Sequence, residues 1–390
     1  MNIYSNIWKL YVIKGLKWFM IVMPIVVLFF QENGLSLQEV MILQGMYSFM
    51  VAAMEIPSGY LADVFGRKNT LILGAIFCFF GFLIISLSFS FWYFIIGEII
   101  LGIGSSFISG ADSAILYDSL AESKKENEYT KVEGVAYGIG NFSEAIAGIC
   151  GGLLAEISLR LTWEIQVVVA GLIIPFTFLL VEPKEHQQNK LPKSFKAIWQ
   201  VVKFSLVENK LLKWLIILSS SIGFATLSLA WFAQPYFKSI DMPLKYFGFA
   251  WAFLNLTTGF SSINAYRLQR LFSKNSFLIF ISLGISISFF LLSKSTAILG
   301  LILITTAYMI RGLATPVMRT YINDITPSNM RATVLSVRSF CIRVTFAIMA
   351  PLLGWIADIY TLEQSFLLLG VIVGITSLLA SLKLKALSND

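Results

Sequence analysis

A set of charged side chains lies inside long apolar runs of this sequence, where the surroundings offer little water. A carboxylate in such a place has its pKa raised by burial, so it can bind and release a proton near neutral pH. An arginine there can bind a carboxylate or phosphate group through two parallel hydrogen bonds. The chemistry available is therefore proton binding, ion pairing and anion recognition. The acids are Glu55, Glu98, Asp112 and Glu144, and the bases are Lys14, Lys17, Arg311, Arg319, Arg338 and Arg343.

Within this set, the acids fall in the first half of the chain and the arginines in the second half. Either acids and arginines pair as gates that break and re-form, or an acid titrates while the arginines bind an anionic group. Static pairs that only hold helices together are the third possibility. Fourteen residues separate Glu98 from Asp112, which on a helix places them on nearly the same face at depths about 21 Å apart. Of the two lysines we expect Lys17 in the site, since Lys14 lies a turn nearer the membrane surface.

Lipid must be the solvent for most of the chain. The sequence has 390 residues, of which 57% are hydrophobic and 13% charged, and its mean hydropathy is +0.78. By these values the chain is too apolar to be a water-soluble domain of this size. A helix that crosses a bilayer needs about 20 mostly apolar residues, and such runs recur with short polar gaps. We expect twelve helices, at 10–30, 38–61, 70–89, 92–117, 132–155, 162–181, 211–237, 244–265, 276–293, 296–322, 332–355 and 362–382.

The longest polar stretch, residues 182–210, separates the sixth run from the seventh. It contains Pro183 and Pro192, which break helices, and several lysines. It therefore predicts a central linker between two six-helix bundles, residues 1–181 and 211–390. Loops with an excess of Lys and Arg face the cytoplasm, and the loops on the linker's side hold that excess, so we expect both termini and the linker to be cytoplasmic. The net charge of +7 has the same origin, and nucleic acid is not an expected partner.

Several kinds of chemistry are excluded. The only histidine, His186, lies in the polar linker, and Cys78, Cys150 and Cys341 fall inside apolar runs, so the sequence predicts neither a disulfide framework nor a metal site. There is no GxxxxGK[ST] phosphate loop and no nucleophile elbow. We therefore expect no cofactor, no direct use of ATP and no enzymatic activity.

The segment GYLADVFGRKNTL, residues 59–71, combines glycines with charges between the second and third runs. Gly59 and Gly66 permit a close approach of helices and a tight turn. Asp63, Arg67 and Lys68 can pair with nearby charges or helix ends, so the cluster can hold one conformation. The segment resembles the cytoplasmic loop signature GxLaDrxGRkxxl of the major facilitator superfamily.

This resemblance implies an all-α membrane transporter of twelve transmembrane helices in two pseudo-symmetric six-helix halves. It also implies that Asp63 and Arg67 hold the outward-facing state, with Asp118 at the cytoplasmic end of the fourth helix as the partner of Arg67. The segment ITPSNMRATVLS, residues 325–336, resembles the loop that enters the eleventh helix in drug-exporter-like members. The chain is thus similar to the drug:proton antiporters of the superfamily.

Three segments depart from the family pattern. AGICGG, residues 147–152, resembles the glycine-rich signature of antiporters but has Gly148 in place of its proline. EIILG, residues 98–102, has Glu98 where many exporters carry an arginine. NAYRLQRLFSKN, residues 264–275, keeps the positive charge of the second-half loop motif without its glycines. The sequence therefore does not decide the direction of transport, or whether the second half has a charged loop that holds one conformation as residues 59–71 can.

From the residues and the resemblance together, we expect a secondary active transporter that works by alternating access. Its expected action is proton-coupled export of a small amphipathic molecule; the alternative is proton-coupled transport of a small organic anion or metabolite bound by the intramembrane arginines. A receptor or enzyme on the same scaffold is a third class, which the missing catalytic motifs and polar domain disfavour. The expected partners are the lipid bilayer, the solute and the proton, for a monomer in the cell membrane.

Overall fold

A computed structural model gives the structure of the protein and describes residues 3–183, 195–295, 297–327 and 330–387. Within these ranges the chain is helical, with no β-strand. Ten of its helices are long and apolar enough to cross a membrane. This all-α architecture follows from the solvent, because a helix satisfies its own backbone hydrogen bonds inside lipid. The fold class is as predicted.

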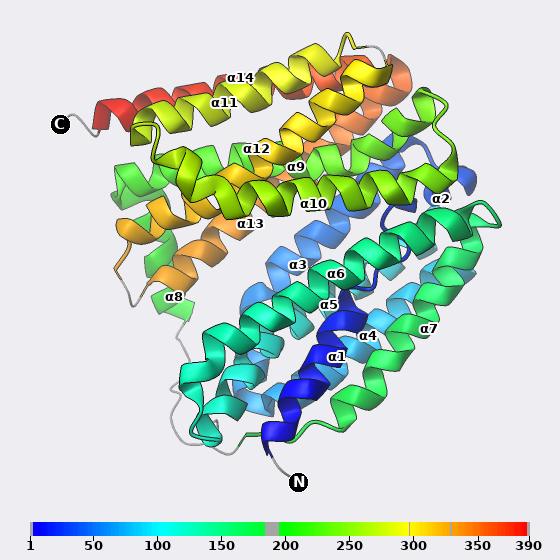
Figure 1. Cartoon of the computed structure of the whole chain (residues 1–390), viewed down its shortest axis with the longest axis vertical. Helices are drawn as coiled ribbons and strands as arrows, with labels where there is room; N and C mark the ends of the chain where they lie inside the picture. The colour runs from blue at the N-terminus through cyan, green and yellow to red at the C-terminus, as the bar shows by residue number, and fades with distance from the viewer. Residues whose placement is uncertain (1–2, 184–194, 296, 328–329, 388–390) are drawn as a thin grey trace. The chain divides into compact units, whose positions relative to one another are not determined.

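The chain divides into two compact units, and the first comprises residues Met1–Gly34, Met46–Lys193 and Pro243–Ala252. In this unit α4 packs along α5 and against α7, while α1 packs against α6 and α7 (Figure 1). Its helices are α1 (Asn6–Trp18), α2 (Val26–Glu32), most of α3 (Leu37–Phe65), α4 (Arg67–Leu87), α5 (Phe91–Glu122), α6 (Tyr129–Ala155) and α7 (Leu159–Phe178).

The second unit comprises Leu35–Gly45, Ser194–Met242 and Phe253–Asp390. Its most buried helix is α9, which contacts α12, α13 and α14, and α11 runs beside α14 (Figure 1). Its helices are α8 (Phe195–Lys203), α9 (Lys210–Ser239), most of α10 (Leu244–Gln269), α11 (Lys274–Leu292), α12 (Ala297–Asp324), α13 (Arg331–Ile359) and α14 (Leu362–Leu387).

Helices α3 and α10 are each divided between the units. The start of α3, within Leu35–Gly45, belongs to the second unit, and the start of α10, within Pro243–Ala252, belongs to the first. The first turn of α3 packs on α13 within the second unit, where the Asp358 carboxylate accepts the backbone N–H groups of Leu37 and Gln38 at 2.9 and 2.7 Å. A Cβ on Gly354 would lie 2.7 Å from the Cα of Gln38, so the helices touch at backbone distance. The division of the chain into bundles at 1–181 and 211–390 stays a prediction.

The first predicted helix, 10–30, is wrong in one respect, because the chain breaks between Trp18 and Val26 to give α1 and α2. Pro24 lies in the break and cannot donate a helical hydrogen bond. The N–H of Ile21 is satisfied by the Gln166 side-chain oxygen of α7 at 2.8 Å. The break is thus a buried, hydrogen-bonded feature of the first unit.

The central linker also differs from expectation, since α8 forms at Phe195–Lys203 and continues into a π-helical turn, Phe204–Glu208. The lysines at 184, 190 and 193, together with His186 and Pro192, lie outside the described residues. The other predicted runs each correspond to one helix of the structure.

We predict that Gly151→Ala lowers the thermal unfolding midpoint of the purified protein. A Cβ at this position would lie 2.0 Å from the carbonyl oxygen of Ile21 in the break, and overpacking of this kind costs about 1–3 kcal/mol. The matched control is Gly134→Ala on the same helix, where a Cβ meets nothing within 4 Å. Equal midpoints for the two variants would show that the break does not depend on this close contact.

Candidate functional site

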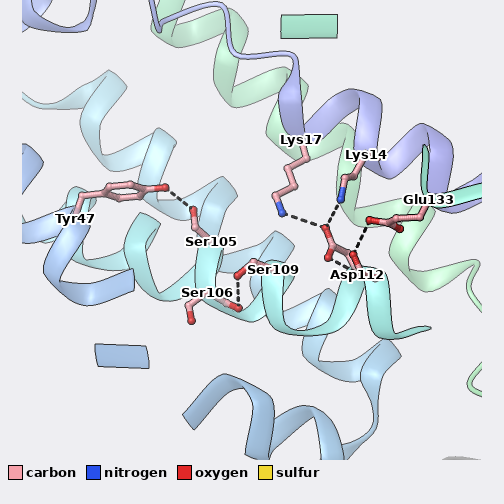
Figure 2. A network of polar contacts seen from close by, with 9 residues as sticks. Lys14, Lys17, Tyr47, Ser105, Ser106, Ser109, Asp112 and Glu133 are labelled. Atoms are coloured by element: carbon pink, nitrogen blue, oxygen red, sulfur yellow. Dashed lines mark hydrogen bonds and ion pairs between the residues drawn. The ribbon is translucent and has the colours of Figure 1, made fainter. Parts of the chain in front are cut away.

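A charged cluster in the first unit centres on Asp112 of α5 (Figure 2). One oxygen of its carboxylate, Oδ2, lies 3.1 Å from the Nζ of Lys14 and 3.3 Å from the Nζ of Lys17. The other oxygen, Oδ1, accepts the backbone N–H of Ser113 at 2.7 Å. The side chain of Asp112 is 11% exposed, and charge-assisted bonds of this kind are strong where water is scarce. Two cations thus stabilise one ionised carboxylate.

The two lysines reach the same carboxylate because they are three residues apart on α1, which places them on one face. Helix α1 packs against both α5 and α6. Lys17 lies in the last turn of α1, about 17 Å along the axis from Asn6 at its start. The cluster is therefore next to the break between α1 and α2.

Two members of the cluster were not predicted to belong to the site. Lys14 was named among the charges in apolar runs but Lys17 was preferred to it, yet Lys14 contacts Asp112 at least as closely as Lys17 does. Glu133 of α6 accepts a hydrogen bond from the Ser113 hydroxyl at 2.9 Å. The spacing of the lysines on one helix face was a usable signal, whereas Glu133 lies at the edge of the predicted run 132–155 and was not singled out.

A row of hydroxyl groups continues from the cluster along α5 (Figure 2). The Tyr47 hydroxyl donates to the Ser105 hydroxyl at 3.1 Å, and Ser106 donates to Ser58 at 3.1 Å. Ser109 donates to the carbonyl of Ser106 at 3.1 Å. Ser105, Ser109 and Asp112 have the spacing that places them on one face of a helix. This face of α5 is polar and can hydrogen-bond a solute.

The other three acids predicted from the sequence lie on α3, α5 and α6. Glu98 is 4% exposed and lies on α5 about 21 Å along the axis from Asp112. Glu55 of α3 and Glu144 of α6 are half-buried. Of the acids proposed from sequence, Asp112 is the one seen in an ion pair with the predicted Lys17.

The loop motif forms a second charged site in the first unit. The Arg67 guanidinium pairs with Asp118 of α5 at 2.8 Å, as the family resemblance implied. Gly66 has φ of +90°, a conformation that favours glycine, and it lets α4 begin at Arg67. The Glu182 carboxylate accepts the backbone N–H groups of Arg67 and Lys68 at 2.8 and 2.7 Å. Glu182 was not expected to take part in this motif.

The remaining motif residues differ in how far they are exposed. Asp63 is exposed near the end of α3, and Lys68 is half-buried in the first turn of α4. A Cβ on Gly59 would meet nothing within 4 Å, whereas a Cβ on Gly110 of α5 would lie 3.6 Å from the backbone N of Gly59, so α3 and α5 come close beside this glycine. Of the two glycines of the motif, Gly66 has the positive φ that the tight turn requires, and Gly59 does not.

The arginines predicted from sequence lie on α12 and α13 in the second unit. Arg338 is 9% exposed, and its Nε donates to the Ser219 hydroxyl of α9. The Arg311 guanidinium lies 5.7 Å from the centre of the Tyr308 ring, and Arg343 is half-buried. Each unit therefore has its own charged side chains inside spanning helices. In the described part of the chain, no group of three or more His, Cys, Asp or Glu residues is placed to bind a metal ion.

Comparison with known proteins identifies the class. The family model of the Major Facilitator Superfamily matches residues 8–314, and the chain belongs to this family of membrane transporters. It is therefore a multi-pass membrane transporter and not an enzyme.

Particular relatives are distant. The chain is 24% identical over 378 residues to an uncharacterised transporter of this superfamily from Methanocaldococcus jannaschii, covering 91% of this chain and 92% of the relative. It is 24% identical over 180 residues to the class H tetracycline resistance protein of Pasteurella multocida, covering 45% of this chain and 44% of that protein. Crystal structures of the nucleoside transporter NupG and a D-xylose–proton symporter share the fold, with TM-scores of 0.83 and 0.71. Their identities are 11% and 16%, over 99% and 97% of this chain and 100% and 97% of theirs.

We predict that Asp118→Asn destabilises the protein more than the double variant Arg67→Met/Asp118→Leu. The Arg67 side chain is 6% exposed, and a buried charge left without its partner costs up to about 3–5 kcal/mol, whereas replacing both partners with apolar groups is often neutral. The thermal midpoint in detergent measures this. If the double variant were as unstable as the single one, the pair would not be the source of the stability.

Proposed function

We propose that this chain is a proton-coupled secondary active transporter in which Asp112, Lys14 and Lys17 link proton binding to movement of the solute. The observation that supports this most directly is the sharing of one carboxylate by two ammonium groups, at 3.1 and 3.3 Å. The carboxylate belongs to α5, a candidate membrane-spanning helix, and ionisable groups within such helices are costly and usually functional.

The linkage follows from the charges. In the arrangement described here, both lysines stabilise the ionised carboxylate of Asp112, so a proton has no favourable place on it. If α1 moves away from α5 during alternating access, the carboxylate loses both partners and takes up a proton. The break after Trp18 allows α1 to move without carrying α2 along as one rigid helix. The released lysines then have positive charge available for the solute.

The solute that this geometry favours is a small organic anion. Two cations surround one carboxylate in the first unit, and Arg311, Arg338 and Arg343 lie within spanning helices of the second. A second candidate is export of a small amphipathic molecule. It is supported by the partial likeness to the tetracycline resistance protein and by the exporter-like segment at 325–336.

The test of coupling is proton flux in proteoliposomes of the purified protein. Asp112→Asn should abolish solute-dependent proton flux, because the amide cannot bind and release a proton as a carboxylate does. The matched control is Glu126→Gln, an exposed carboxylate in the turn before α6. Proton flux that persists in Asp112→Asn would make the cluster a static ion pair or a gate.

The nature of the solute is tested in the same vesicles with labelled candidates of both kinds. For a small organic anion, Lys17→Gln should weaken uptake by about tenfold, since a hydrogen bond to a charged group contributes about 1.5–3 kcal/mol. Transport of lipophilic cations should not occur. Transport of such cations with Lys17→Gln unaffected would favour the amphipathic exporter.

A further inference from the structure

The guanidinium of Arg338 is the most deeply buried positive charge of the predicted arginine set. It lies about 10 Å along α13 from Arg331 at the start of that helix, and the residue is 9% exposed. Its Nε donates to the hydroxyl of Ser219, which is a neutral acceptor. A buried cation is normally balanced by an anion, and this contact does not supply one.

The sequence of the second unit offers no carboxylate at that depth. From residue 195 onward, every acid lies in a connection, within two residues of a helix end or at the C-terminus, and Glu39 of the 35–45 segment lies in the first turn of α3. These acids are Glu208, Asp241, Asp324, Asp358, Glu363 and Asp390.

The groups around Arg338 would make binding of an anion there more favourable. The field of a second cation, Arg319 of α12, acts on the same guanidinium. Ser219 accepts from Arg338, so its own hydroxyl hydrogen is available for another acceptor. A guanidinium beside a hydroxyl donor is the arrangement that binds carboxylate and phosphate oxygens.

We propose that Arg338, together with Ser219, forms a binding subsite for an oxyanion, the carboxylate or phosphate group of the transported solute. This inference rests on the proposed function as a transporter and narrows its solute to molecules that carry such a group. The subsite shares no residue with the Asp112 cluster, because Ser219 and Arg338 belong to α9 and α13.

The test is ligand-dependent thermal stabilisation of the full-length protein purified in detergent. A ligand that binds only the folded state raises the unfolding midpoint. The probes are benzoate with its uncharged counterpart benzamide, and glycerol phosphate with glycerol. We expect benzoate or glycerol phosphate to raise the midpoint and the uncharged counterparts to leave it unchanged. Which anion acts tells whether the group recognised is a carboxylate or a phosphate.

Three variants assign the stabilisation to the subsite. Arg338→Gln should weaken the apparent affinity of the anion by about ten- to a hundredfold, as expected for loss of charged hydrogen bonds. Arg338→Lys should keep part of it, and Ser219→Ala should lose less than Arg338→Gln. The control is Arg267→Gln, which removes an exposed arginine from the last turn of α10 and should have no effect. If Arg338→Gln does not fold, Arg338→Lys and Ser219→Ala carry the comparison.

Other outcomes overturn the proposal. These are an absence of anion stabilisation, stabilisation that persists unchanged in the Arg338 variants, and equal effects of benzamide and benzoate. Stabilisation by phosphatidylglycerol alone, lost in Arg338→Gln, would assign the subsite to a lipid headgroup. Asp112→Asn separates the two proposals: anion stabilisation should survive in it while proton flux is lost. Loss of proton flux in Asp112→Asn without anion stabilisation of the native protein would leave the transporter proposal standing and the subsite wrong.

Discussion

The interaction between Asp112 and the two lysines of α1 constrains how the helices of the first unit pack. Moving a charge into a medium of low dielectric is costly, and the cost is tolerated only where opposite charges meet with good geometry. Such a cluster restrains the helices that contribute to it. Here α1 must present two cations to α5 and then stop, while α6 supplies Glu133 beside it. Glycines let α1 and α6 approach closely, since a Cβ on Gly15 would lie 3.3 Å from Ile139 Cγ2 and a Cβ on Gly140 would lie 3.0 Å from Trp18 Cδ1.

Much of the fold could be predicted from the sequence, because lipid imposes one rule on every spanning segment. The apolar runs located the helices, and the loop motif at 59–71 identified the family that the comparison confirms. The break after Trp18 could not be predicted from hydropathy. The run from 10 to 30 is apolar throughout its second half, and hydropathy does not show which backbone groups lose their helical hydrogen bonds. Its cause lies in Pro24 and in Gln166, a residue 145 positions from Ile21.

The candidate site was predicted in part. Asp112, Lys17, Arg67 and Asp118 were recognised, because charges in apolar runs and a known motif stand out. Lys14 was ranked below Lys17, and Glu133 and Glu182 were not singled out, because each lies near a predicted membrane boundary, where a charge normally has water and needs no partner. Pairing between distant segments is a property of the folded chain, and a single sequence does not contain it. The roles of Glu55, Glu98 and Glu144 stay predictions.

The contact between Asp358 and the first turn of α3 has a consequence for biosynthesis. Gln38 and Asp358 are separated by 320 positions, so α3 enters the membrane long before the carboxylate that caps it has been translated. During that interval the first backbone N–H groups of α3 must be satisfied by water or lipid headgroups. A nascent chain that stalls before α13 therefore carries a frayed end on α3, and the second unit is completed only when the last helices join a segment made near the beginning.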